Sequence, residues 1–525
     1  MMFLKEILRK QVRGKKNSNS QSRSKQSRSG VSSPISPGTA TTPVESASSD
    51  RSPEQRSSTS GSPDQKEETI ASRDTRSGVA TQFKGTSATG LRKQLVIGLD
   101  FGTAFTKVVV GEERLRIAIP LQGIGEKQQD YLLPTVFWAA QNGACSLDPG
   151  SGVAHEDLKM SLIEGNFSTD VLFDTTVYLA LVLRRVRAYL FVHKKGIYGN
   201  SHIDWLLNVG LPTDSFHSEK LNEAYKSIVG AAWLVSAQPG DIYRAQVVKI
   251  LEKKKRYESA DSLNTLHPES ISLFPEFVAQ VTGYVRSPMR QSDLHLLVDV
   301  GAGTLDVTIF NVHQKDDEDV FPILAKAVEP LGTRFLTKHR FKNDTNGQGI
   351  KFSAYDLIPD VDEFAELLGI SVGCLQKLDI PFRKKVRKLV SDLLVYTKEK
   401  RYPIARCWED GVPIFLCGGG VNCDFYSEAF YSKYEKVLGF PLRKMQLPKP
   451  DQLEAKGITE AEYDRLSVAY GLSFDPFDIG EIVKEGDIDD VSEKAVSVAG
   501  MCHRCSGNGG LHRACNACGG CGFIL

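Results

Sequence analysis

Two segments about two hundred residues apart place a carboxylate beside a glycine turn in the same order. The first spans Leu95–Val110 and the second spans Leu296–Phe310. Each begins with an apolar run that ends at an aspartate, Asp100 or Asp299, and continues with glycines, a threonine and a β-branched run. A glycine turn offers backbone N–H groups to phosphate oxygens, and a carboxylate holds Mg²⁺ largely through water. Two such turns facing each other would clasp a polyphosphate and its magnesium ion.

The residues after each turn indicate which element positions these groups. A P-loop or dinucleotide-binding fold would place a helix there, but Thr106–Val110 and Asp306–Phe310 favour a returning strand. Both segments are therefore predicted to be β-hairpins. A third glycine turn, 418–420, follows the buried-strand pattern Val412–Cys417 and precedes a helical pattern that starts at Phe425. Three glycines at that point let the backbone approach a flat ring or a phosphate.

These motifs resemble the phosphate-1, phosphate-2 and adenosine motifs of the superfamily that contains actin, DnaK chaperones and sugar kinases. The resemblance covers about 380 residues, Lys93–Phe474, and implies an α/β, two-lobed actin-like ATPase fold with duplicated ribonuclease-H-like sheets and ATP in the cleft. Its most specific element is Asp299-x-Gly301-x-Gly303-Thr304-x-Asp306, which is similar to the DnaK-type phosphate-2 pattern. Shorter pieces also resemble family elements: Val209–Thr213, Pro275–Gln280 and Ala469–Gly471.

The resemblance also implies roles for individual residues. Asp100 and Asp299 would hold Mg²⁺, and Glu276 would orient the attacking water. Lys107 lies seven residues after Asp100, as the phosphate-contacting lysine does in actin and the plasmid-segregation actins, whereas DnaK chaperones take their lysine from elsewhere. Two alternatives stay open at this point: Lys107 as a strand-surface lysine, and Glu276 as an ordinary helix-start acid favoured by the dipole.

The remaining nucleotide contacts divide into three groups. Backbone N–H groups for the phosphates would come from Gly102, Thr103, Ala104, Gly301, Ala302 and Gly303. Thr304 and Asp306 would brace the second hairpin near the γ-phosphate, and Gly418, Gly419 and Gly420 would contact the adenosine.

The chain also departs from the DnaK pattern. Pro330-Leu-Gly332-Thr333 has one glycine where DnaK chaperones have a pair, and the interval from Asp299 to Gly418 is short for that class. About fifty residues follow the predicted ATPase region, too few for a substrate-binding sandwich and helical lid. We therefore expect no peptide-binding domain.

The last residues contain two C-x-x-C-x-G-x-G repeats. Their paired thiolates predict a tetrahedral structural Zn²⁺ site, which would hold so small a segment folded. The predicted ligands are Cys502, Cys505, Cys515 and Cys518, with Cys521 either spare or an alternative ligand. The repeats resemble the cysteine-rich region of DnaJ-type co-chaperones, which implies a surface for protein contact.

Composition sets the domain organisation. The 525 residues carry a net charge of +1 and are 41% hydrophobic, so a large core can form. The expected parts are a disordered, basic, Ser-rich tail (1–93), lobe I (94–295), lobe II with the closing helix (296–475), an acidic linker (476–498) and the zinc module (499–525). The tail could also contact anionic membrane or nucleic acid weakly, or act as a transit peptide.

Cysteine usage and hydropathy bear on location. The ten cysteines suit a reducing compartment with one metal site, and no apolar run suggests a signal peptide or a membrane span. We expect a cytoplasmic protein whose oligomeric state the sequence does not set.

The resulting hypothesis is a slowly hydrolysing ATP-binding switch, DnaK-like but without the peptide-binding domain, that meets a protein partner or client through its tails. A filament-forming actin relative is the first alternative, favoured by Lys107 and the short second-lobe insertion. A small-molecule kinase of the same fold and an inactive ATP-binding scaffold are the others. Nucleotide-dependent pelleting, a metabolite-stimulated ATPase assay and an Asp299→Ala change with unaltered function would reveal these three in turn.

Overall fold

The computed structural model describes residues 91–149, 152–213, 216, 218–257, 266, 268–315, 318–342, 352–356, 358–430 and 433–491. The predicted cysteine module, nearly all of the predicted N-terminal tail and the end of the predicted linker lie outside these residues. Within the described residues, no helix is both long enough and apolar enough to cross a bilayer.

The first sheet has the strand order β10-β8-β1-β2-β3, with two short strands added at its far side. Strands β1, β2 and β3 form an antiparallel meander, while β8 runs parallel to β1 and β10 runs parallel to β8. The strands are β1 (Arg92–Phe101), β2 (Phe105–Glu112), β3 (Leu115–Ala118), β8 (His202–Leu211) and β10 (Ile271–Pro275), with β4 (Leu133–Pro134) beside β2 and β16 (Leu453–Glu454) beside β3.

The second sheet repeats this design in the order β15-β14-β11-β12-β13-β17. Strands β11, β12 and β13 again form an antiparallel meander, β14 runs parallel to β11, and β15 runs parallel to β14. The strands are β11 (Asp293–Val300), β12 (Leu305–Lys315), β13 (Glu318–Glu329), β14 (Val412–Cys417), β15 (Leu442–Met445) and β17 (Glu481–Val483). A three-strand meander joined to two parallel strands, found twice, confirms the predicted α/β fold with duplicated ribonuclease-H-like sheets.

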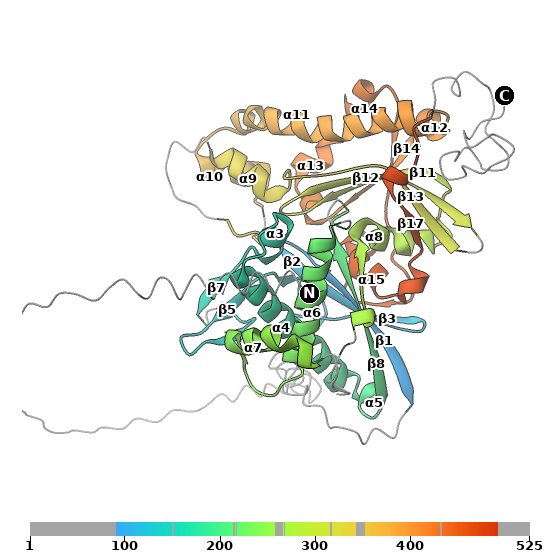
Figure 1. Ribbon diagram of the computed structural model, residues 1–525. Coiled ribbons are helices and arrows are strands. Elements are labelled where there is room, and N and C mark those ends of the chain that lie inside the picture. Colours follow the sequence, from blue (N-terminus) through green and yellow to red (C-terminus); the bar gives the residue numbers. More distant parts are fainter. Residues whose placement is uncertain are drawn as a thin grey trace, which may run out of the picture. The chain divides into compact units, whose positions relative to one another are not determined.

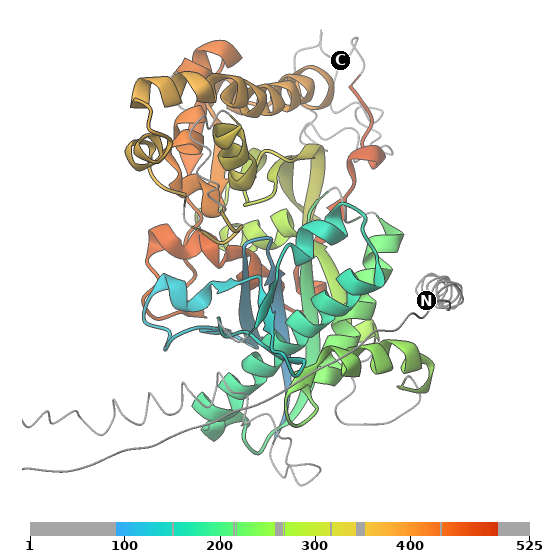
Figure 2. The same cartoon turned by 90° about the vertical axis from the view of Figure 1, so that its left-hand side faces the viewer.

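Helices complete each repeat. In each repeat, a 25-residue helix follows the meander and precedes the next core strand along the chain. This helix is α4 (Thr169–His193) in the first repeat and α11 (Val372–Tyr396) in the second. Figures 1 and 2 show α4 beside α6 (Glu219–Ser236), and α11 lying over the second sheet. The other helices are α3 (Leu158–Ile163), α5 (Lys195–Tyr198), α7 (Arg244–Tyr257), α9 (Thr333–Phe341), α10 (Val361–Leu368), α12 (Cys407–Asp410), α13 (Asp424–Ala429) and α14 (Lys433–Leu438).

A small sheet accompanies the first lobe, in the order β7-β5-β6-β9. Its strands are β5 (Phe137–Ala139), β6 (Ala144–Ser146), β7 (Val153–His155) and β9 (Ile242–Tyr243).

Two helices form a layer between the large sheets. α8 (Glu276–Val285) and α15 (Ser467–Leu472) contribute to one core cluster that also contains Val109 from the first sheet and Phe310 from the second. Burying apolar residues of both sheets against the same helices ties the two repeats together. Figure 1 shows both helices between the sheets.

The segment after residue 475 differs from the predicted solvated linker. β17 pairs in parallel with the edge strand β13, and the side chains of Ile479 and Ile488 are buried. The backbone N–H of Val491 donates to the carbonyl of Lys400 at 2.7 Å. The excess of acids in this stretch obscured the two buried isoleucines. Pairing with the edge of β13 provides the backbone hydrogen bonds that order the segment.

The close contact between α15 and α8 gives a stability prediction. A Cβ added at Gly471 would lie 1.9 Å from the carbonyl oxygen of Ala279, so Gly471→Ala must push the helices apart. We expect its free energy of unfolding to fall by about 1–3 kcal/mol, measured by urea unfolding of the whole chain. Gly196→Ala is the control, because a Cβ there meets no atom within 4 Å. Equal urea midpoints for the two variants would contradict this account of the packing.

Candidate functional site

A cavity of about 440 Å³ lies between the two repeats, lined by both hairpin turns, the start of α8 and the triple-glycine turn. Asp100, Lys107, Glu276 and Asp299 all line it. So do Gly102, Thr103, Ala104, Gly301, Ala302, Thr304, Asp306, Gly418, Gly419 and Gly420. The structure therefore brings the predicted nucleotide contacts to one cavity, with Gly303 as the exception.

The first hairpin sets a lysine against a carboxylate. The β1–β2 register places Asp100 opposite Lys107, and Lys107 Nζ lies 2.6 Å from Asp100 Oδ2. The side chain of Asp100 is only 7% exposed and that of Lys107 only 13%, so both charges are largely removed from water. The turn between them needs glycine, because a Cβ at Gly102 would lie 2.3 Å from the carbonyl oxygen of Phe105.

The second hairpin sets two carboxylates against each other. Asp299 lies opposite Asp306 in the β11–β12 register. Burial and the charge of Asp100 raise the pKa of Asp299, while a 2.8 Å hydrogen bond from Gln280 Nε2 and the charge of Lys107 oppose the rise. Burial and the charges of Glu276 and Asp299 hold the pKa of Asp306 well above its ordinary value. The Oδ1 atom of Asp306 has no hydrogen-bond partner among the described residues.

Close approaches explain several of the glycines. Gly418 has φ +86°, and a Cβ there would lie 2.2 Å from Asp299 Oδ1. A Cβ at Gly332 would lie 2.6 Å from the carbonyl oxygens of Gly301 and Ala302, so the single glycine of that segment is also required. Gly303 does not line the cavity, and a Cβ there would lie 2.4 Å from Met160 Sδ. This glycine instead leaves room for α3.

Sequence analysis missed Lys159, at the start of α3. Its Nζ lies 2.5 Å from Glu276 Oε1, and its side chain is 5% exposed. Burial alone would lower the pKa of Lys159, but the charges of Glu276 and Asp100 raise it overall. Burial raises the pKa of Glu276, and Lys159 opposes that rise. No motif surrounds Lys159, because its role arises from the folding of α3 against α8 rather than from local spacing.

Two further cavity residues, Asp464 and Arg465, lie on the turn before α15. A Cβ at Gly419 would lie 3.0 Å from the Arg465 guanidinium, which also lies over the Phe105 ring at 5.9 Å. Burial raises the pKa of Asp464 to about 6, helped by Asp299 and opposed by Arg465. Their position a few residues before Ala469–Gly471 was the available signal.

Polar contacts cross from one repeat to the other at the edge of the cavity. Both Asp157 oxygens accept hydrogen bonds from the Arg334 guanidinium, one of them at 3.0 Å. Glu156 accepts hydrogen bonds from the hydroxyls of Ser353 and Tyr355 at 3.3 Å. Asp157 has φ +59°, a left-handed conformation that costs about 1 kcal/mol or more for a residue with a side chain.

The donor set suits a magnesium polyphosphate. Buried aspartate oxygens are hard ligands, and burial together with neighbouring carboxylates raises the pKa values of Asp299 and Asp306, a cost that a bound dication would relieve. Lys107, Lys159 and Arg465 supply cations for phosphate oxygens. No group of three or more His, Cys, Asp or Glu in the described part of the chain is arranged to bind a metal directly. An ion held mainly through water and phosphate needs no such group.

The predicted zinc ligands Cys502, Cys505, Cys515 and Cys518 lie outside the described residues. The zinc site and its DnaJ-like surface therefore stay predictions.

No protein-family model and no curated protein matches the sequence. Among solved structures, the chain is similar to MreB 5 of Spiroplasma citri bound to AMPPNP, with 14% identity and a TM-score of 0.41 over 73% of this chain and 95% of that one. It is also similar to MreB5 of the same organism bound to ADP, with 13% identity and a TM-score of 0.38 over 72% and 94%. Similarities of this size assign no function, so the site itself must carry the assignment.

The Lys159–Glu276 pair gives a pH-dependent prediction. Lys159→Met leaves the Glu276 carboxylate buried without its cation, so its pKa rises further and the folded state holds a proton that the unfolded state releases. Relative to wild type, the variant should lose little stability at pH 5 and up to about 3 kcal/mol at pH 8. Urea unfolding at both pH values measures this.

The control for that measurement is Lys159→Met combined with Glu276→Gln, which removes both charges. The double variant should show no extra loss at pH 8. A loss in the single variant that is equal at both pH values would contradict the pairing.

Proposed function

We propose that the cavity binds Mg²⁺-ATP and that the chain hydrolyses it slowly, as a two-lobed, chaperone-like switch of the actin-like ATPase superfamily. The observation that carries the proposal is the meeting of Asp100 and Asp299, each at the tip of its own hairpin, in one cavity that α8 also lines. A hairpin turn alone has no functional meaning. Two turns of the same design, converging from a duplicated fold, form a clasp with matched halves.

Each group has a role that follows from its position. The turn N–H groups of 102–104 and 301–302, with Lys107 and Lys159, bind phosphate oxygens. Asp100, Asp299 and Asp306 hold Mg²⁺, which when bound neutralises charge on the phosphates. The glycines 418–420 bring backbone against the adenosine.

Glu276 is the residue that orients and accepts a proton from the attacking water. It stands at the first position of α8 and faces the same cavity as both hairpin turns. Lys159 opposes the rise in the pKa of Glu276 that burial causes, and its 2.5 Å contact fixes the position of the carboxylate. Because that pairing also engages an oxygen of the base, slow turnover is the expected behaviour.

Switching follows from the contacts that cross the cavity edge. Closure around a nucleotide would bring the two phosphate loops together. It would also act on the Asp157–Arg334 pair, because the backbone N–H of Arg334 donates to the carbonyl of Ala302 in the second loop. Partners would engage the chain outside this cavity. The Zn²⁺ module of Cys502, Cys505, Cys515 and Cys518 is the proposed contact surface for a protein partner, by its resemblance to DnaJ-type regions.

The decisive variant is Asp299→Asn. It keeps the shape of the side chain but removes the charge, so Mg²⁺-dependent ATP affinity should fall roughly tenfold or more. Titration of the whole chain with ATP, with and without Mg²⁺, measures the change.

The matched variant is Glu276→Gln in the same cavity. Because Glu276 is assigned to the water and not to the nucleotide, ATP affinity should stay within about threefold while hydrolysis falls on the order of 10²-fold. Wild-type ATP binding by the Asp299 variant, or wild-type hydrolysis by the Glu276 variant, would overturn the respective assignment.

A filament-forming ATPase is the second candidate, favoured by Lys107 facing Asp100 inside the cavity, where an actin-type phosphate lysine would lie. On the switch proposal, wild-type chain should stay in the supernatant with Mg²⁺-ATP and with Mg²⁺-ADP in a high-speed spin at increasing protein concentration. Pelleting above a critical concentration, abolished by Asp299→Asn, would instead establish the filament.

A further inference from the structure

A second cavity adjoins the first, between α9 and the segment 352–358. Its volume is about 450 Å³, within the range of about 300–1,000 Å³ typical of small-molecule pockets. Thr333, Ala354, Asp356 and Ile358 line both cavities. A ligand in the second cavity would therefore share a wall with the first.

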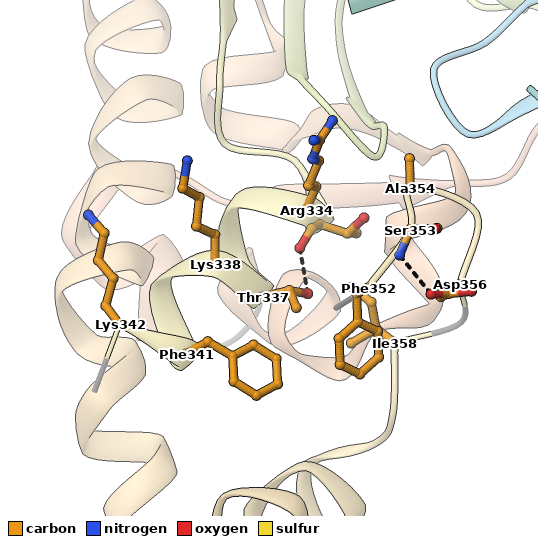
Figure 3. A pocket seen from close by; sticks show the side chains of 11 residues that line it. Arg334, Thr337, Lys338, Phe341, Lys342, Phe352, Ser353, Ala354, Asp356 and Ile358 are labelled. Carbon is orange, nitrogen blue, oxygen red and sulfur yellow. Dashed lines mark hydrogen bonds between the residues drawn. The ribbon is translucent and has the colours of Figure 1, made fainter. Parts of the chain in front are cut away.

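One side of this second cavity is basic. Arg334 and Lys338 on α9 and Lys342 at its C-cap are spaced four residues apart, which places their side chains on one face. Figure 3 shows all three extending from the same side of α9. Arg334 is held by Asp157, whereas no carboxylate pairs with Lys338 or Lys342 in the part of the chain that the structure describes. Two exposed cations are thus left to face a ligand.

The same cavity also has an aromatic surface, formed by one ring on α9 and one on the segment opposite it. The rings of Phe341 and Phe352 lie 5.6 Å apart, and both pack near Phe364. Ile358 adds a further apolar surface. Figure 3 shows Phe341 and Phe352 beside each other, with Ile358 next to Phe352.

Polar contacts hold the segment opposite α9 in place. The backbone N–H of Ser353 donates to Asp356 Oδ2 at 2.7 Å, so the one acid that lines the cavity is already engaged. The Ser353 hydroxyl donates to Glu156. The aromatic wall is therefore backed by α10 through Phe364, and the segment is anchored before any ligand arrives.

We propose that this second cavity binds a small organic phosphate with a flat apolar body, its phosphate on Lys338 and Lys342 and its body against Phe341 and Phe352. Two exposed cations, neither paired with a carboxylate among the described residues, attract an anion, and the ring pair favours a planar group over a plain ion. A concave site of this size, carried by one helix and one short segment, fits a small molecule rather than an extended polymer.

Binding there should be felt in the first cavity, a consequence that rests on the proposed function. The backbone N–H groups of Thr333 and Arg334, at the start of α9, donate to the carbonyls of Gly301 and Ala302 in the second phosphate loop at 3.1 and 2.9 Å. A ligand that shifts α9 would therefore also shift the loop that would hold the γ-phosphate.

The test is calorimetric titration of the full chain with phenyl phosphate and, separately, with inorganic phosphate. Wild type should prefer phenyl phosphate, and Lys338→Glu with Lys342→Glu should weaken phenyl phosphate binding roughly tenfold or more. The matched control is Lys384→Glu with Lys385→Glu, two exposed lysines on α11 that line neither cavity. Phe352→Ala should erase the preference for phenyl phosphate over phosphate.

Absent binding by wild type, or equal affinities in the α9 double variant and the α11 control, would overturn the proposal. A preference that survives Phe352→Ala would overturn the aromatic wall. ATP affinity is measured in the same preparations and should be unchanged in both double variants. Charge-dependent phenyl phosphate binding without ATP binding would refute the proposed function and leave the second cavity standing.

Discussion

Negative charge is concentrated around one cavity between the two repeats. Asp100, Glu276, Asp299 and Asp306 share one cavity, and two carboxylates about 4 Å apart repel by about 4 kcal/mol at an effective dielectric constant of about 20. Lys107 and Lys159 each neutralise one of the four, through Asp100 and Glu276. In the second hairpin, burial and the charges of neighbouring carboxylates raise the pKa values of Asp299 and Asp306, and the nearby lysines only oppose that rise. Such an arrangement is costly for stability, and the Mg²⁺ of the proposed function would offset that cost.

The duplicated fold is what concentrates that charge. In open sheets, ligands bind beyond the carboxyl ends of parallel strands. β1 ends at the first hairpin turn, β10 ends immediately before Glu276, β11 ends at the second hairpin turn and β14 ends immediately before Gly418. The carboxyl ends of strands from both sheets therefore meet at the same cavity. α8 and α15 hold the sheets in that relation, and the close contact at Gly471 shows how little separation they allow.

What the sequence predicted was local, and what it missed was long-range. The hairpins follow from the alternation of an apolar run, a glycine turn and a β-branched run, so their strands lie close to where the pattern places them. Lys159 enters the cavity through tertiary approach, and nothing adjacent to it in the chain marks that approach. The edge strand β17 was missed because acids dominate the segment around it, while its pairing depends on the free edge of β13. Residues 492–525 lie outside the described residues, so the zinc prediction rests on spacing alone.

The residues around α3 connect these observations. Within four positions, Asp157 pairs with Arg334, Lys159 pairs with Glu276, and Met160 packs where only glycine fits at Gly303. All three partners lie in or beside the machinery assigned to phosphate and water, and two of them belong to the second repeat. A shift of the second phosphate loop must therefore displace Met160 or Arg334, and either movement acts on the short helix that carries Lys159. The left-handed Asp157 is consistent with this, since a strained residue persists only where surrounding contacts over-determine it. The segment thus couples the position of the second lobe's loop to the lysine that pairs with Glu276 in the first.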